Sequence, residues 1–152
     1  MDAHDDAGVI DQAEGKCLCG AVTIVVAQMK PHLDICHCDM CRRWGGMAFM
    51  GISGKSFTLS GEEHVTSYPS SQWAERAFCN TCGSNLWYRF TPDDHYSFLA
   101  GLFDLPDNIG FLQQIFIDEK PGYYDFVQQC PMKTGSEIIA EAEAAGHIFP
   151  SD

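Results

Sequence analysis

The sequence predicts a mainly β fold, in which short antiparallel strands form packed sheets within a single domain. Two observations favour this class: many short runs of β-type residues alternate with turn residues, and no long helical pattern separates them. A third observation is that seven of the eight cysteines fall into three tight clusters. We expect a zinc site with four cysteine ligands to staple the sheets together.

The predicted elements follow these runs along the chain. The expected strands cover residues 21–26, 47–52, 57–59, 64–68, 86–90, 96–102 and 114–118. Glycines such as Gly54 and Gly61 mark turns between them. Two helical segments are expected: a short turn over residues 39–44, and a weak helix over residues 136–145 that is rich in Ala and Glu.

The chain has 152 residues, a length typical of one domain, and it contains no internal repeat. The first residues are acidic and polar, so residues 1–14 are predicted to form a flexible acidic tail. We therefore expect the zinc-binding domain to cover residues 15–152.

The chain is strongly acidic, with a formal net charge of -12 at pH 7. Nucleic-acid binding draws much of its affinity from neutralising phosphates, so this charge disfavours that role. No apolar stretch approaches the roughly 18–20 residues that a membrane span needs. We expect a soluble protein that binds neither nucleic acid nor a membrane, and the sequence leaves its oligomeric state open.

The cysteine pattern favours metal binding over disulfide bonds. The chain begins with acidic residues and lacks the basic start and apolar run of a secretory signal, so we expect a cytoplasmic, reducing location. With 45% hydrophobic residues, a chain of this length can build a core without covalent cross-links.

Seven clustered cysteines divide into four ligands and three. A structural zinc takes four protein ligands, whereas a catalytic zinc keeps three and leaves one position open. Cys17 and Cys19 form one knuckle, and Cys79 and Cys82 form another; each ends in a glycine that permits a tight turn. We assign these four to a structural zinc. Pairing of Cys79 and Cys82 with two cysteines of the middle cluster remains an alternative.

The middle cluster consists of Cys36, Cys38 and Cys41, and it predicts a second, labile zinc site that is open to substrate. Two polar residues alternate with these thiols, His37 and Asp39. Each is either a fourth ligand, a partner of a ligand or, in the favoured interpretation, an exposed polar residue.

Cations lie directly beside this cluster. Arg42 and Arg43 follow Cys41, and they can stabilise thiolates or receive a substrate carboxylate. Cys130 lies outside the clusters and is not expected to be a ligand.

Four parts of the chain carry a family resemblance: residues 15–22 (GKCLCGAV), 36–42 (CHCDMCR), 68–71 (YPSS) with 76–84 (RAFCNTCGS), and 101–104 (GLFD). In these segments the chain resembles the glutathione-dependent formaldehyde-activating enzyme family, which includes centromere protein V-like zinc proteins. The resemblance implies a mostly antiparallel β fold. It also implies one zinc on Cys17, Cys19, Cys79 and Cys82, and a second on Cys36, Cys38 and Cys41.

The activity implied by this resemblance is formation of S-(hydroxymethyl)glutathione from glutathione and formaldehyde, a carbon–sulfur lyase reaction written in reverse. Cys36, Cys38 and Cys41 would form the catalytic centre, because an open trithiolate zinc can activate a thiol. Glutathione carries two carboxylates, and the cations expected to bind them are Arg42, Arg43, Lys55 and Arg76.

A non-catalytic, zinc-stabilised binding module is the alternative function. Its partner would bind a groove formed by aromatic side chains, including Trp44, Trp73 and Trp87. An open middle metal distinguishes the enzyme from the module.

Overall fold

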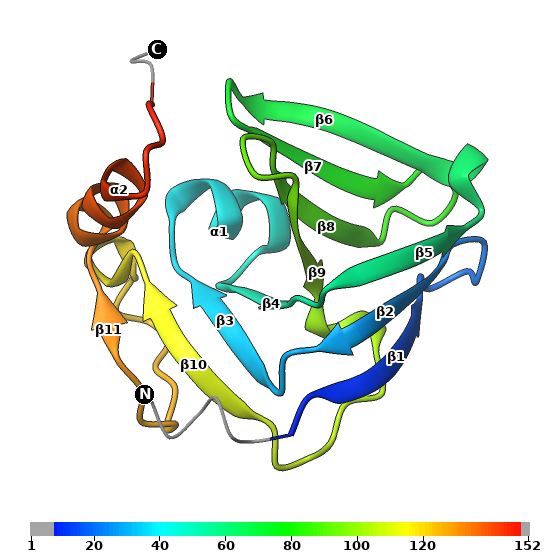
Figure 1. The fold of residues 1–152 in the computed structure, drawn as a ribbon, viewed down its shortest axis with the longest axis horizontal. Helices are drawn as coiled ribbons and strands as arrows, with labels where there is room; N and C mark the ends of the chain where they lie inside the picture. The colour runs from blue at the N-terminus through cyan, green and yellow to red at the C-terminus, as the bar shows by residue number, and fades with distance from the viewer. Residues whose placement is uncertain (1–7, 150–152) are drawn as a thin grey trace. The chain divides into compact units, whose positions relative to one another are not determined.

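Strands dominate the computed structural model of the chain, which describes residues 8–149 (Figure 1). The mainly β fold predicted from the sequence is confirmed. The chain folds into two compact units, each built from two stretches of sequence. The first unit comprises the residues up to Pro31 together with Gly51–Ile109, and the second comprises His32–Met50 and the residues from Gly110 onward.

The first unit contains two antiparallel arrangements of strands. One has the order β1-β2-β5: β1 (Ile10–Lys16), β2 (Thr23–Met29) and β5 (Ser56–Ser60). The other is a meander of β6 (Val65–Ser71), β7 (Ala74–Cys79), β8 (Asn85–Phe90) and β9 (His95–Leu99), which lie side by side in Figure 1. The end of β4 (Phe49–Ile52) pairs with β9. Two 3-10 turns complete the unit, η1 (Glu62–His64) and η2 (Ala100–Leu102).

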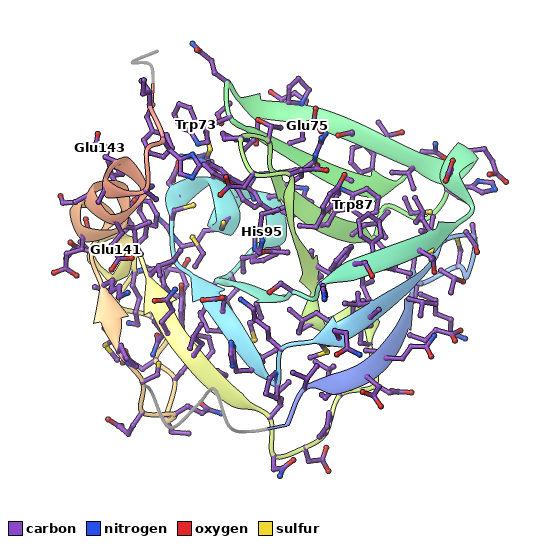
Figure 2. All side chains as sticks on the ribbon, in the orientation of Figure 1. Trp73, Glu75, Trp87, His95, Glu141 and Glu143 are labelled. Atoms are coloured by element: carbon purple, nitrogen blue, oxygen red, sulfur yellow. The ribbon has the colours of Figure 1, made fainter. Side chains whose placement is uncertain are left out.

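Aliphatic and aromatic side chains form the core of the first unit. Ile24 and Val26 of β2 are fully buried, which follows from the alternation of inward and outward side chains along a strand. Trp87 is 7% exposed and packs edge-on against Tyr96 and Phe98, and Figure 2 shows its side chain on β8. This tryptophan therefore contributes to the core and is not available to line a groove.

The second unit is a small parallel arrangement with the strand order β11-β10-β3: β3 (His32–Cys36), β10 (Gly110–Ile115) and β11 (Met132–Lys133). Its helices are α1 (Asp39–Gly45), the 3-10 turn η3 (Ile117–Glu119) and α2 (Gly135–Ala144). Thr134 and Glu137 form a reciprocal capping box that begins α2, so the weak helix expected near the C-terminus forms. Figure 2 labels Glu141 and Glu143 on this helix.

The structure differs from the sequence-based expectations in several elements. Strand β1 begins at Ile10, inside the predicted tail, because Ala13 and Gly15 are buried where β1 pairs with β2; residues 1–7 lie outside the described residues. Strands β3, β7 and β11 were not predicted. The strand expected over residues 114–118 is β10 in the structure, which ends at Ile115, and the 3-10 turn η3 begins at Ile117. Both partnerships of β10 are parallel rather than antiparallel.

No helix within residues 8–149 combines the length and apolar character that crossing a membrane requires.

Candidate metal centres

Four cysteines of the first unit converge at one point. Cys17 and Cys19 lie in the turn between β1 and β2. Cys79 is the last residue of β7, and Cys82 lies in the turn that follows it, before β8. The four Sγ atoms are within 4.8 Å of one another. The distances from Cys19 Sγ to the sulfurs of Cys17 and Cys79 are 3.6 and 3.8 Å. A tetrahedral zinc with bonds of about 2.3 Å separates its sulfurs by about 3.8 Å, so the group fits such an ion.

Both knuckles end in a glycine with the same φ, although the second turn is one residue longer. Gly20 and Gly83 both have φ of 80°, a conformation that glycine adopts without a steric penalty. In each turn the glycine N–H donates to the carbonyl of the first cysteine, Cys17 or Cys79. The sequence pattern therefore encodes two glycine-ended turns, each of which brings two sulfurs into the four-cysteine group.

Ser84 links the two knuckles. Its Oγ accepts a hydrogen bond from the Leu18 N–H at 3.0 Å and lies 3.2 Å from Cys82 Sγ; when Cys82 is a thiolate, which only accepts, Ser84 donates its proton to that sulfur. Hydrogen bonds from the Ser84 side chain and backbone, with a further one from the Cys19 backbone, lower the pKa of Cys82 to about 5. This serine therefore favours the thiolate form that a metal ligand needs.

Replacing Ser84 with alanine is expected to weaken metal retention without destroying the fold. Hydrogen-bond partners of metal ligands typically contribute about tenfold or more to metal affinity, and Ser84→Ala removes one. Competition with a chromophoric chelator should show about tenfold weaker retention. Ser67→Ala, which alters an exposed serine of β6, is the control; equal retention by both variants would contradict the role of Ser84.

Three cysteines of the second unit form the other cluster. Cys36 ends β3, Cys38 caps α1, and Cys41 lies in the first turn of that helix. Their sulfurs lie within 4.8 Å of one another, and within residues 8–149 no fourth His, Cys, Asp or Glu joins the group. Side-chain hydrogen bonds to Cys38 and Cys41, together with burial, raise the pKa of Cys36. Three thiolates this close repel one another, so a bound cation is needed to hold all three in that form.

His37 is fully buried, contrary to the favoured expectation that it is an exposed polar residue. Its Nε2 lies 2.8 Å from Gln114 Oε1, and its Nδ1 lies 2.8 Å from the Tyr124 hydroxyl. Because an amide oxygen only accepts, Nε2 carries the proton and Nδ1 accepts from Tyr124. Burial lowers the pKa of His37, to which the charges of Lys120 and Arg42 also contribute. His37 is therefore a neutral anchor of the loop between Cys36 and Cys38.

The predicted cations occupy different environments. Arg42 donates from Nε to the His37 carbonyl at 3.1 Å, and its side chain is 24% exposed. Arg43 pairs with Asp39 at 2.9 Å and is largely exposed. In the first unit, Arg76 is 5% exposed with its guanidinium over the Tyr88 ring, and Lys55 is exposed. Only Arg42 and Arg43 thus belong to the same unit as the three-cysteine cluster.

Comparison with known proteins decides the family. The model of the glutathione-dependent formaldehyde-activating enzyme family matches residues 12–119, well over half of the chain. The chain belongs to this family.

One relative supports family membership, and one solved structure supports the fold. An uncharacterized lyase of Schizosaccharomyces pombe is 39% identical over 128 residues, which cover 83% of this chain and 93% of the relative. A crystal structure of a Rhodobacter sphaeroides protein matches with a TM-score of 0.53 and 24% identity, over 62% of this chain and 91% of that one; at this identity the match supports the fold alone. Family membership and the lyase relative together support a lyase-like function related to glutathione and formaldehyde, and both cysteine clusters could hold metal ions.

Proposed function

We propose that this protein is a zinc-dependent carbon–sulfur lyase-type enzyme that forms or cleaves the S-hydroxymethyl adduct of glutathione, or of a related thiol, with formaldehyde or another small electrophile. The observation that carries this proposal is the cluster of Cys36, Cys38 and Cys41, in which three thiols converge without a fourth metal-binding side chain among the described residues. Three soft ligands suit an open zinc site.

The two clusters have separate roles in this proposal. Cys17, Cys19, Cys79 and Cys82 hold a structural zinc, and Cys36, Cys38 and Cys41 hold a labile catalytic zinc. A Zn²⁺ ion held by Cys36, Cys38 and Cys41 would lower the pKa of a thiol ligand and so supply a nucleophile at neutral pH. In the synthetic direction the sulfur forms a bond to the aldehyde carbon, the carbon–oxygen double bond becomes a single bond, and the thiol proton ends on the hydroxyl oxygen.

Residues of the chain position this chemistry. The hydrogen bonds of His37 to Gln114 and Tyr124 fix the loop that carries Cys36 and Cys38. Its Nε2 proton is directed at Gln114, which makes His37 a positioning residue rather than the donor of a proton to the aldehyde oxygen.

Three arginines are proposed to receive the carboxylates of glutathione. We rank Arg42 first, because it binds the carbonyl of His37 in the loop of residues 36–38, here called the catalytic loop, and its side chain is partly exposed. Arg43 comes second and Arg76, which is buried over Tyr88, comes third. None of the eight cysteines forms a disulfide bond, which suits the reducing cytoplasmic location that we propose for the enzyme.

Two-dimensional exchange spectroscopy tests the proposed reaction, because it measures the rate at which formaldehyde and its thiol adduct interconvert at equilibrium. Zinc-loaded protein is expected to accelerate this exchange above the spontaneous background. Metal-free protein should not. Exchange at the background rate with both clusters loaded would contradict the proposal for this substrate pair.

The double variant Arg42→Ala/Arg43→Ala tests carboxylate recognition. We expect about tenfold weaker glutathione binding by calorimetry, since charge-assisted hydrogen bonds to a carboxylate are lost. Zinc content should stay unchanged, because neither arginine is a metal ligand. Lys30→Ala, at an exposed lysine of the other unit, is the control. Unchanged glutathione affinity in the double variant would remove both arginines from the proposed site.

A further inference from the structure

The carboxyl ends of three parallel strands meet at one edge of the second unit. Strands β3, β10 and β11 run in the same direction, and Figure 1 shows them leading to α1, η3 and α2. Ligands commonly bind just beyond the carboxyl ends of parallel strands. The catalytic loop follows β3 at this edge, and the segment that follows β10 carries η3 and the residues up to Phe126.

A pocket of about 270 Å³ is lined by this second segment together with β10 and β11. It is lined by Gln114, Ile117, Lys120, Asp125, Phe126 and Met132. Pockets that enclose an entire drug-sized ligand have volumes of roughly 300–1,000 Å³, so this one accommodates one end of a peptide-sized molecule. Its lining combines three apolar side chains with the polar groups of Gln114, Lys120 and Asp125.

The pocket adjoins the catalytic loop through shared residues. Gln114 lines the pocket and accepts the hydrogen bond from His37 Nε2. The next residue, Ile115, is the strand partner of Cys36. On the other side of His37, Lys120 Nζ lies 5.2 Å from the centre of the Tyr124 ring, whose hydroxyl binds His37 Nδ1. A molecule bound at Lys120 is therefore separated from His37 of the catalytic loop by the Tyr124 side chain.

Lys120 is a charged group with a replaceable partner. Its side chain is only 14% exposed, whereas its ion-pair partner Asp125 is 84% exposed and lies 2.7 Å away. A largely buried ammonium needs an anionic or hydrogen-bonding partner, but an ion pair with an exposed carboxylate contributes little stability. Lys120 Nζ also donates to the Pro121 carbonyl at 3.1 Å, so a ligand carboxylate can take the position of Asp125 while that hydrogen bond stays in place.

We propose that this pocket is the subsite for one of the two carboxylates of the thiol substrate and that Lys120 is its cation, while the arginines named above receive the other. The inference rests on the proposed function and narrows the substrate to thiols that carry a carboxylate at the far end of a short chain, as glutathione does. Simple amine thiols such as cysteamine lack the group that Lys120 recognises. The apolar walls formed by Phe126 and Met132 pack against the chain between the two ends.

Calorimetry on the zinc-loaded protein tests the subsite with three ligands. Glutathione offers both the thiol and the carboxylates, S-methylglutathione retains the carboxylates without a free thiol, and cysteamine offers a thiol without a carboxylate. Lys120→Met should bind both tripeptides about tenfold more weakly and cysteamine unchanged. Lys133→Met is the matched control, because Lys133 pairs with Glu141 on α2 at 2.8 Å and does not line the pocket.

Asp125→Asn provides a variant with an effect of the opposite sign. It removes the competing carboxylate from an exposed position, so we expect severalfold tighter binding of both tripeptides. Tripeptide affinities that stay at the wild-type value in both Lys120→Met and Asp125→Asn would overturn the subsite, as would a wild type that binds neither tripeptide. A different result would contradict the proposed function itself, in which the thiol binds at the zinc site: the affinity for cysteamine would then be the same with and without zinc.

Discussion

Replacing Cys79 with serine should abolish the structural metal site and leave the chain largely unfolded at 25 °C. Cys79 is fully buried at the end of β7, and its sulfur lies 3.8 Å from that of Cys19, so it connects the two knuckles. Structural zinc binding contributes roughly 10 kcal/mol or more to small domains, comparable to the entire stability of about 5–15 kcal/mol of a typical domain. Loss of one thiolate removes much of that contribution.

Circular dichroism and zinc analysis of purified Cys79→Ser measure this effect. Cys130→Ser is the matched control, because Cys130 lies outside both clusters and a serine oxygen can accept the hydrogen bond that Gln114 Nε2 donates to Cys130 Sγ at 3.5 Å. We expect the control to retain the native spectrum and metal content. A Cys79→Ser protein with wild-type zinc content and thermal stability would show that the four-cysteine group has no structural role.

Cys38→Ser is expected to have the largest effect on activity while preserving the fold. Cys38 is the N-cap of α1, and its side chain accepts from the Cys41 N–H at 3.3 Å. Serine is among the best N-cap residues, so the substitution removes a thiolate and keeps the cap. We expect the exchange rate of the thiol adduct to fall to the spontaneous background, a loss of about 100-fold or more in catalysed rate if the metal is lost.

The matched variant Cys38→Ala separates the two roles of this side chain. It removes both the thiolate and the cap, so its free energy of unfolding should be lower than that of Cys38→Ser by about 1 kcal/mol. Both variants should lose activity. Activity retained in Cys38→Ser would place the chemistry outside the three-cysteine cluster.

The sequence predicts the parts of the site that are local in the chain. The cysteine spacing and the glycines that follow Cys19 and Cys82 indicate two separate groups of cysteines. These features can be predicted because the conformation of a short turn depends on the residues within and beside it. The turn over residues 39–44 is likewise confirmed as α1. The strands that form from β-branched runs, such as β2, are also found close to their expected positions.

The remaining features depend on pairings between distant residues. His37 meets Gln114 and Tyr124 across 77 and 87 positions of sequence, and nothing near His37 indicates that it is buried. The parallel pairing of β3 with β10 is equally non-local, and a strand containing His32 and Asp34 lacks a clear β-type pattern. For the same reason Lys120 could not be assigned to the candidate site from the sequence alone.

The central claim is that the cluster of Cys36, Cys38 and Cys41 holds a metal with an open coordination position that a thiol can fill. Visible spectroscopy of protein loaded with Co²⁺ at this cluster, and with Zn²⁺ at the other, tests it directly, because cobalt bands respond to the number and type of ligands. The claim predicts that one equivalent of glutathione intensifies the thiolate-to-cobalt band, with saturation at one thiol per chain and no response in Cys38→Ser. A spectrum already characteristic of four protein ligands, and unchanged by excess glutathione, would contradict it.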